Sequence, residues 1–437
     1  MSYHKKKVSI LVIFVLLACL MSGCSFTVNG ANTGVKDGKI QLRVTWWGSQ
    51  DRHDKTLRAI QLFEKENPDI HVIPEFTGWD GYWQKLATAA AGKNLPDVIQ
   101  MDYAKLMEYI DRDLIVDMNS YVETGTLDLS DVGKAYIEGG YVDGKLYAVN
   151  LGTNSPAIAY NPEMFKKAGI EEFKPGYTWE DFAKISIQLQ EKFGGGMYGA
   201  GGVANALPWF NIYLRQHGFE VYNSDGTGLG YKDDKLLIDF LQYWDELLKD
   251  GIAAPPKVTS AIQGLEDELI VHEKSPFLWF HSNQIVALQQ SAGKDIKLAV
   301  FPSTSGGKEG LYLKPSQFFS ISKDSKHKEA AAKFVDFFTN DIEANDLLAA
   351  ERGVPISKKV REHLRPKMND AGKEMFDYVE RVESHSSPIY PPEPSGSGEV
   401  GILFDRIIER LNYGNISVEE AATQFREEAE EILAKNK

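Results

Sequence analysis

Two adjacent tryptophans at the end of a predicted strand are the residues of this sequence best placed to hold a ligand. The strand alternates apolar residues up to Trp46 and Trp47, and the polar loop 48–52 follows it. Because successive side chains of a strand point to opposite faces, we expect Trp46 to face the core and Trp47 to face a ligand. Ligands of open α/β sheets bind beyond the carboxyl ends of the strands. The pair therefore predicts one structural ring and one flat apolar platform.

The elements that must position these rings alternate between strand and helix. Strands are predicted at residues 40–47, 70–76 and 97–101, and amphipathic helices at 54–67 and 82–91. This order predicts a parallel, doubly wound α/β sheet with right-handed connections. Two later strands, 146–149 and 157–160, are separated by a segment that contains glycine and proline. Such a segment suits a crossover between two lobes.

Length, composition and charge limit the classes of function. The chain has 437 residues, enough for two domains, and its 43% hydrophobic and 25% charged residues are typical of a globular protein. Its net charge of −14 repels a phosphate backbone, so nucleic acid is not an expected partner. An anionic ligand would need a local group of basic side chains to offset this charge.

Motifs for catalysis, nucleotides and metals are weak or missing. Residues 194–199 fit the spacing G-x-G-x-x-G, but they follow a helix instead of a strand, which argues against a dinucleotide site. The turn 223–228 lacks the glutamate that closes a calcium loop. The sequence has no H-E-x-x-H, P-loop or G-x-S-x-G motif. We therefore predict no catalytic residues, no cofactor and no metal site.

The first residues predict export and a lipid anchor. Three lysines, Lys5 to Lys7, precede an apolar run that is short for a membrane span, and two small residues then precede Cys24. This ending resembles the lipobox of bacterial lipoproteins, in which Cys24 would carry the lipid; Cys19 is the alternative. Both cysteines of the chain lie in this segment, so the exported body has no disulfide and no thiolate metal site. The small and polar residues that follow predict a flexible tether.

Several short motifs, spread over the chain, are shared with a known family. They are Thr45-Trp-Trp-Gly48, Phe63-Glu-Lys-Glu-Asn-Pro68, Leu95-Pro-Asp-Val-Ile99, Ile158-Ala-Tyr-Asn-Pro-Glu-Met-Phe165, Ser325-Lys-His-Lys-Glu-Ala-Ala-Ala-Lys-Phe334 and Glu351-Arg-Gly-Val-Pro355. In this order they resemble the sugar-binding lipoproteins of bacterial ABC importers, the maltose-binding-like group of family 1 solute-binding proteins. The resemblance implies a two-lobe α/β fold of the periplasmic-binding-protein type II class. Each lobe would be a doubly wound sheet, three hinge crossings would join the lobes, and the ligand would lie in the cleft between them.

The resemblance also implies boundaries and partners. It divides the chain into a signal peptide (1–23), a tether (24–38), a first lobe (39–151 and 303–353) and a second lobe (152–302 and 354–437). The protein would be a monomer, held at the extracellular face of the cell membrane by the lipid on Cys24. By clamshell closure it would capture an oligosaccharide and deliver it to permease subunits that work with a cytoplasmic ATPase.

A sugar site needs flat apolar surfaces and planar polar groups. The aromatic candidates are Trp47, Trp79, Tyr82, Trp209 and Trp279, and the alternative for each of them is packing in the core. Tyr82 and Trp83 begin a helix, so one of these two is expected to be core. Trp179 and Trp244 have core spacing on helices and are assigned to packing.

Three polar residues are candidates for binding sugar hydroxyls. Asp102 ends a strand, Asn154 lies in the crossover segment and Asn283 follows the strand of Trp279. The alternative for Asn283 is a helix N-cap, a role that Ser282 could also take. His53 and His281 are assigned to structural hydrogen bonds.

Local matches narrow the expected ligand. The loop 46–54, Leu313-Lys-Pro-Ser316 and Pro391-Pro-Glu-Pro394 are similar to lipoproteins that bring rhamnogalacturonan and related pectic oligosaccharides into Gram-positive bacteria. An anionic uronate requires basic groups, and the fork of arginine suits a planar carboxylate. Arg52, Lys314 and Arg352 lie at predicted lobe edges and are the candidates, with a surface cation as the alternative for each.

Other functions remain open at this point. A receptor for neutral galactan, arabinan or xylan oligosaccharides would use the same aromatic residues. An exported glycoside hydrolase or polysaccharide lyase would need a matched pair of carboxylates, and no motif nominates one. A sugar-sensing subunit that signals through a partner kinase is a third class.

Overall fold

The strand with the two tryptophans lies inside a six-stranded sheet. The computed structural model describes residues 35–36, 38–202 and 206–436. The strands of this sheet are β1 (Val35–Lys36), β2 (Lys39–Trp47), β3 (Ile70–Thr77), β4 (Val98–Met101), β7 (Val149–Asn150) and β13 (Phe318–Ile321). β2 pairs in parallel with β3 and β4, whereas β13 pairs antiparallel with both β4 and β7. The predicted parallel order therefore holds for the first three long strands, and a segment from late in the chain completes the sheet.

Helices cover this first sheet and bury its apolar side chains. They are α2 (Gln50–Glu66), α3 (Trp79–Ala91), α4 (Tyr103–Asp111), α5 (Asn119–Glu123), α6 (Lys134–Ile137), α13 (Lys328–Asn340), α14 (Ile342–Leu348) and α15 (Lys358–Leu364). The turn η1 (Glu138–Gly140) and the hairpin β5 (Tyr141–Val142) and β6 (Lys145–Leu146) follow α6. The ring of Phe63 in α2 lies 5.1 Å from that of Phe334 in α13, which joins the start of the chain to its last quarter.

The second sheet is smaller, and its three described strands pair antiparallel, unlike the doubly wound sheet that was expected in each lobe. β9 (Pro156–Tyr160) lies between β10 (Phe277–His281) and β11 (Lys297–Ala299). Its helices are α7 (Pro162–Ala168), α8 (Trp179–Phe193), α9 (Leu207–Gln216), α10 (Lys235–Lys249), α11 (Pro256–Thr259), α12 (Ile285–Ala292), α16 (Asp370–Glu383), α17 (Ser397–Asn412) and α18 (Val418–Leu433). Short 3-10 turns are η2 (Leu265–Asp267), η3 (Ser282–Gln284), η4 (Arg365–Lys367) and η5 (Ala434–Asn436). Trp179 and Trp244 are buried against Trp279, as their spacing predicted.

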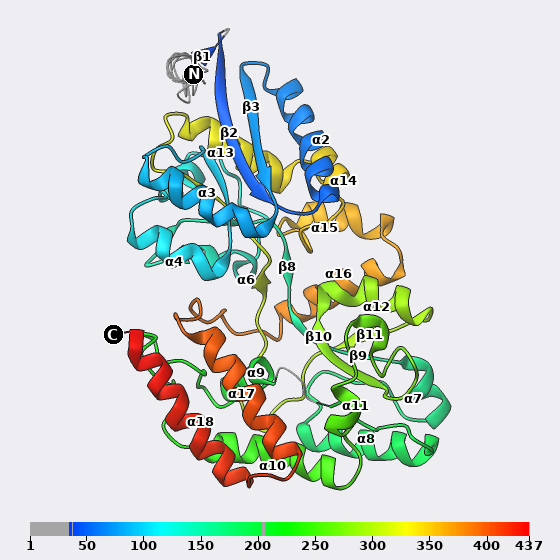
Figure 1. Cartoon of the computed structure of the whole chain (residues 1–437). Coiled ribbons are helices and arrows are strands. Elements are labelled where there is room, and N and C mark those ends of the chain that lie inside the picture. The colour runs from blue at the N-terminus through cyan, green and yellow to red at the C-terminus, as the bar shows by residue number, and fades with distance from the viewer. Residues whose placement is uncertain (1–34, 37, 203–205, 437) are drawn as a thin grey trace, which may run out of the picture.

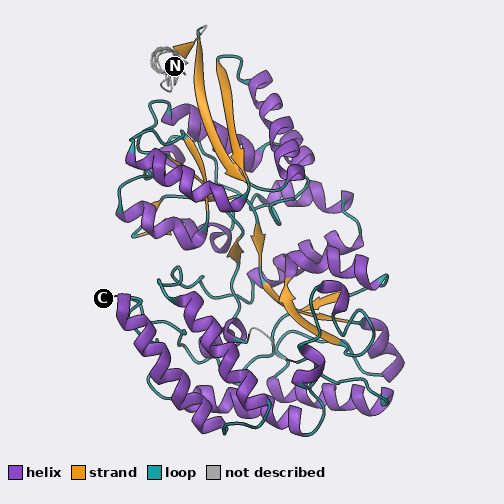
Figure 2. Ribbon diagram, in the orientation of Figure 1, coloured by secondary structure: helices purple, strands orange, loops and turns teal. Residues whose placement is uncertain are grey.

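Extended crossings join the two lobes (Figure 1). Two of them, β8 (Thr153–Asn154) and β12 (Lys314–Pro315), pair antiparallel, so that Lys314 faces Asn154 and Pro315 faces Thr153. Figure 2 shows these two short strands alone between the sheets of the lobes. The third crossing runs from α15 to α16. The two-lobe fold with three crossings is therefore confirmed.

Two of the predicted lobe boundaries do not fit the contacts. The backbone NH of Ser303 donates to the Tyr177 carbonyl at 2.7 Å, and that of Lys308 donates to the Gln216 carbonyl at 2.8 Å. Residues 303–313 thus pack on the second lobe. At the other boundary, the Ser357 hydroxyl bonds to the Asp131 carboxylate at 3.1 Å, which holds the start of α15 on the first lobe. We therefore propose that the first lobe resumes at 314 and ends near 367.

The predicted signal peptide (1–23) and residues 24–34 and 37 of the predicted tether, which include Cys24, lie outside the described residues. In the part of the chain that is described, no helix is both long enough and apolar enough to cross a membrane.

Candidate functional site

A cleft of about 640 Å³ lies between the lobes, and six of the eleven predicted ligand-binding residues line it. They are Arg52, Asp102, Asn154, Asn283, Lys314 and Arg352. Arg52, Asp102 and Arg352 come from the first lobe, and Asn283 comes from the second lobe. Asn154 and Lys314 lie on the two paired crossing strands. Loop residues that are far apart in sequence thus meet at one place, and these six remain the proposed ligand contacts.

Two arginines and one glutamate form the first-lobe wall of the cleft. The Arg52 Nε donates to both carboxylate oxygens of Glu351, at 2.8 and 3.0 Å, and the Glu351 carboxylate also lies 3.5 Å from Arg352. All three side chains are largely buried. Two positive charges therefore share one negative charge, and the group has a net charge of +1. A cationic wall in a chain of net charge −14 is a feature that an anionic ligand would use.

Arg352 is fixed from behind by neutral groups. Its guanidinium donates to the Thr56 hydroxyl at 3.0 Å and to the Gln100 side-chain carbonyl at 3.3 Å. Burial, and then the positive charge of Arg52, lowers the pKa of Arg352 to about 9. The guanidinium still carries its proton at pH 7, so the charge is present but poorly solvated. Such a charge gains more from an anionic ligand than a surface charge does.

The crossing strands add a third cation, Lys314, and a buried acceptor, the side-chain oxygen of Asn154. Lys314 is exposed and faces Asn154 in the β8–β12 pair. The side-chain oxygen of Asn154 is buried and has no hydrogen-bond partner among the described residues. A buried acceptor left without a donor costs about 1–3 kcal/mol. A ligand hydroxyl that reached this buried oxygen and donated a hydrogen bond to it would recover that energy.

Asp102 and Asn283 face the cleft from opposite lobes. One oxygen of Asp102 accepts from the backbone NH of Ala104 at 2.9 Å, so this residue also caps α4. The cap position before η3 belongs to His281, and Ser282 instead accepts from the Ser155 backbone NH at 3.0 Å. Asn283 is therefore not a helix N-cap, the alternative role that the sequence left open for it.

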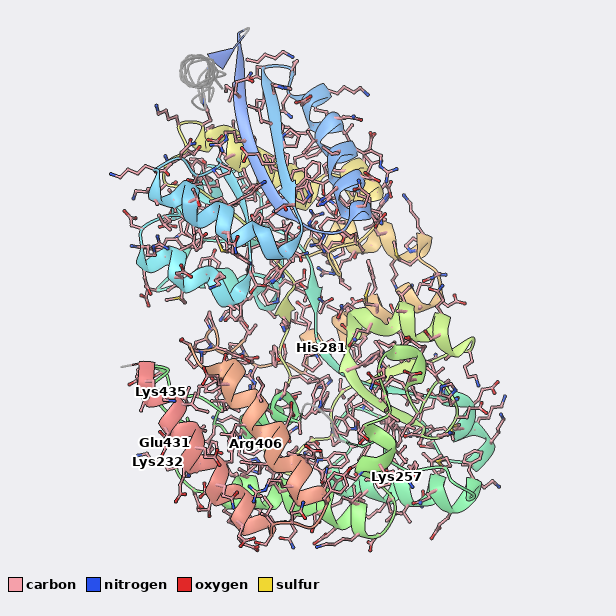
Figure 3. All side chains as sticks on the ribbon, viewed as in Figure 1. Lys232, Lys257, His281, Arg406, Glu431 and Lys435 are labelled. Atoms are coloured by element: carbon pink, nitrogen blue, oxygen red, sulfur yellow. The ribbon has the colours of Figure 1, made fainter. Side chains whose placement is uncertain are left out.

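His281 lines the cleft, although the sequence assigned it to structure. Figure 3 labels it at the edge of the second lobe that faces the first lobe. Burial, and then the positive charge of Lys314, lowers the pKa of His281 to about 4. The ring is therefore neutral at pH 7 and can both donate and accept a hydrogen bond. His53, by contrast, is buried in α2 and accepts from the Trp46 indole at 3.1 Å, as a structural histidine should.

The depressed pKa of His281 predicts a pH dependence of stability. Unfolded histidine titrates near 6.5, so the unfolded state binds more protons than the folded state between pH 4 and 6.5, and stability falls as the pH drops through that window. Between pH 7 and pH 5 this one group should remove about 2 kcal/mol from the free energy of unfolding. Urea titrations of the wild type and of His281→Gln at both pH values measure the difference. Equal losses in the two proteins would contradict the assignment.

The first-lobe aromatic residues form a packed cluster, which corrects two predictions. Trp47 is only 8% exposed, because the rings of Trp79, Tyr82 and Trp83 lie 5.1–5.6 Å from its own ring. Tyr82 is buried, and its hydroxyl donates to the Gln100 carbonyl at 2.7 Å. Neither residue is the open platform that was predicted. Trp46 is fully buried, as predicted.

Trp79 is the exposed member of this cluster. It is 48% exposed at the start of α3, yet it is not among the residues that line the interlobe cleft. Trp79 remains a proposed ligand contact only for a chain that extends past the cleft.

The second-lobe tryptophans line a neighbouring cavity. Trp209 and Trp279 are buried, with ring centroids 6.2 Å apart, and both line a cavity of about 390 Å³. That cavity shares His281 and Gln284 with the interlobe cleft. The indole NH of Trp279 is buried and has no hydrogen-bond partner among the described residues. The two rings are therefore placed beside the cleft, behind His281.

The sequence did not identify several residues that shape the cleft. Tyr103, at the start of α4, donates from its hydroxyl to the Tyr390 carbonyl at 2.5 Å and so connects the lobes across the cleft. Tyr390 and Glu393 lie in a loop that the sequence analysis noted for its match at Pro391-Pro-Glu-Pro394, without predicting that either side chain would line the cleft. The only sequence signal that could have identified Tyr103 as a cleft residue was its position directly after Asp102. In the described ranges, no group of three or more His, Cys, Asp or Glu residues is placed to hold a metal ion.

Comparisons with known proteins place this geometry among binding proteins. A sequence profile described as "Bacterial extracellular solute-binding protein" matches residues 48–344. A solved structure titled "Extracellular solute-binding protein family 1", from Alicyclobacillus acidocaldarius, is 32% identical, with a TM-score of 0.84 over 91% of this chain and 100% of that one. The Multiple sugar-binding protein of Streptococcus mutans is 27% identical over 76% of this chain and 78% of its own length. A periplasmic oligogalacturonide binding protein of Yersinia enterocolitica, solved with saturated digalacturonic acid, is 25% identical, with a TM-score of 0.69 over 91% of this chain and 99% of that one.

Proposed function

Because the chain belongs to the bacterial extracellular solute-binding protein family, we propose that it is the oligosaccharide-binding component of an ABC importer. The cleft between the lobes takes the ligand, and closure of the lobes around it presents the loaded form to the permease. The family consists of binding proteins, so the role is capture and delivery instead of chemistry on the sugar.

We propose that the ligand is acidic, of the pectic or rhamnogalacturonan class. The observation that carries this proposal is the group of three cations, Arg52, Arg352 and Lys314, that line the cleft of an acidic protein. An arginine fork binds a planar uronate carboxylate in two places at once. The Yersinia neighbour, described as an oligogalacturonide binding protein, supports the same class.

A neutral oligosaccharide is the second candidate. Asp102, Glu351 and Glu393 line the same cleft, so its formal charges balance. Carboxylates and the amides of Asn154 and Asn283 are suited to sugar hydroxyls. Galactan, arabinan and xylan fragments are therefore the ligands to compare.

We also propose that the protein works as a monomer at the extracellular face of the cell membrane. The lipid would be carried on Cys24, and the polar residues after it would act as the tether. Its partners would be the permease subunits and, through them, the cytoplasmic ATPase.

Calorimetry on the protein from Ser25 onward tests the ligand class. Digalacturonate or a rhamnogalacturonan fragment should bind with a dissociation constant of about 1 μM or tighter, about −8 kcal/mol. Galactan, arabinan and xylan fragments of equal length should bind at least tenfold more weakly, because they carry no anion to balance the net positive charge of the Arg52–Glu351–Arg352 group. Raising the salt concentration should weaken the acidic ligand more than a neutral one.

Two results would reject these proposals. Tight binding of a neutral fragment without binding of an acidic one would select the second candidate. Release of shorter products during incubation would show an enzyme and reject the receptor role.

A further inference from the structure

A second cavity, of about 570 Å³, opens in the second lobe directly beside the interlobe cleft. Tyr390 and Glu393 line both spaces, so the loop that carries them is the shared wall. In Figure 1 this loop, between α16 and α17, lies below α4 and above α9. A chain molecule bound in the cleft can therefore continue past Tyr390 into this cavity, which we call the side pocket.

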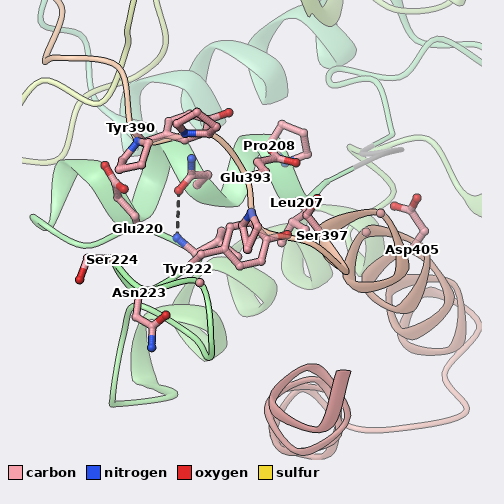
Figure 4. A pocket seen from close by; sticks show the side chains of 18 residues that line it. Leu207, Pro208, Glu220, Tyr222, Asn223, Ser224, Tyr390, Glu393, Ser397 and Asp405 are labelled. Carbon is pink, nitrogen blue, oxygen red and sulfur yellow. Dashed lines mark hydrogen bonds between the residues drawn. The ribbon is translucent and has the colours of Figure 1, made fainter. Parts of the chain in front are cut away.

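The side pocket combines rings and oxygen acceptors. Figure 4 shows Tyr222 beside Ser397, with Tyr390 and Glu220 on one side and Asp405 on the other. Three prolines, Pro391, Pro392 and Pro394, add rigid apolar surface. Flat apolar groups mixed with a few fixed polar groups are what the faces and hydroxyls of a sugar require.

The charge of the side pocket is opposite in sign to that of the first-lobe wall. Its charged residues are Glu220, Glu393 and Asp405, and among the described residues that line it there is no lysine, arginine or histidine. The Arg215 guanidinium bonds to Glu220 at 2.8 Å but is itself buried, outside the lining. Burial raises the pKa of both Glu220 and Asp405, so neither carboxylate is fully hydrated. Uronate groups are repelled by such a surface, whereas neutral hydroxyls can donate to it.

We propose that the side pocket binds neutral sugar residues that are covalently attached to the acidic oligosaccharide in the cleft. The proposal rests on the proposed function and extends it. The protein would recognise branched or mixed oligosaccharides that contain both acidic and neutral sugars. The cleft selects the acidic backbone through its arginines, and the side pocket selects the neutral part through its rings and carboxylates.

The test compares two ligands with one backbone. The first is a short acidic rhamnogalacturonan oligosaccharide, and the second is the same oligosaccharide with neutral galactosyl branches. Calorimetry with the wild type should give at least tenfold tighter binding of the branched ligand. The gain measures what the side pocket contributes.

Gly401→Phe is the variant that blocks the side pocket. Gly401 lines it on α17, and a Cβ added there would meet no heavy atom within 4 Å, so the new ring enters open space. Phenylalanine also favours a helix more than glycine does, so the fold should be kept. The variant should bind the short ligand within twofold of the wild type and lose the gain from the branches.

Ile402→Phe is the matched control. Ile402 is the next residue on α17, is 73% exposed and is not part of the side-pocket lining. This variant should bind both ligands as the wild type does. A branched ligand that gains nothing in the wild type, or whose gain survives Gly401→Phe, would overturn the side-pocket proposal and leave the cleft assignment intact. Failure of the wild type to bind either ligand would reject the acidic-ligand proposal and the side pocket with it.

Discussion

Replacing Trp47 with alanine is expected to lower the free energy of unfolding by about 3–5 kcal/mol, the range for a buried tryptophan. The indole is 8% exposed and is surrounded by the rings of Trp79, Tyr82 and Trp83, so truncation leaves a cavity that this rigid cluster cannot fill. Denaturant unfolding followed by circular dichroism measures the loss. A ligand-facing Trp47, as expected from the strand pattern, would instead leave stability nearly unchanged.

Trp79→Ala is the control for this variant. Trp79 belongs to the same cluster but is 48% exposed, so its removal deletes fewer buried contacts. We expect a loss of about 1 kcal/mol, well below that of Trp47→Ala. Equal losses would show that the loss in free energy of unfolding depends on the integrity of the whole cluster and not on the burial of the ring that is removed.

The second large effect is expected for Arg52→Met. The change removes one of the two cations that share Glu351, so the first-lobe wall falls from a net charge of +1 to zero. A hydrogen bond to a charged group contributes about 1.5–3 kcal/mol, so affinity for an acidic oligosaccharide should fall about 30-fold. Calorimetry at constant salt measures this change. Neutral oligosaccharides should lose much less.

Arg43→Met controls for loss of an arginine elsewhere. Arg43 is on β2 and pairs with Glu75 at 2.6 Å, but it does not line the cleft. Its variant should bind acidic ligands as the wild type does. If Arg52→Met also keeps full affinity, or weakens acidic and neutral ligands equally, the arginine does not recognise a uronate.

Local patterns predicted the elements well, because each depends on residues close in sequence. Alternation gave β2 and its buried Trp46, and the helix after it buries Ile60 and Phe63 on one stripe. The position of Arg52 after a strand end and of Asn154 in a crossover also follows from local signals. All of these are decided within about ten residues.

Features that depend on contacts between segments distant in sequence could not be predicted from local patterns. Trp47 is buried by the rings of Trp79 and Trp83, about 35 residues later in the chain, and no residue close to Trp47 in sequence predicts this burial. The antiparallel strand β13 arrives from more than 200 residues away to pair with β4. The loop with Tyr390 reaches the cleft only because α16 and α17 place it there. Tertiary contacts, and not propensity, decide these positions.

The paired crossing strands have a consequence for the order of events in binding. Asn154 and Lys314 face each other on β8 and β12, so two proposed contacts lie on the crossing strands about which we expect the lobes to turn. Points near a pivot move little while the bodies on either side swing. A sugar that contacts Asn154 and Lys314 should therefore keep these contacts before and after closure, whereas its contacts with the two lobes should form only as the lobes close. We therefore expect substitutions of Asn154 or Lys314 to change the rate of ligand capture, and substitutions in the lobes to change the rate of release.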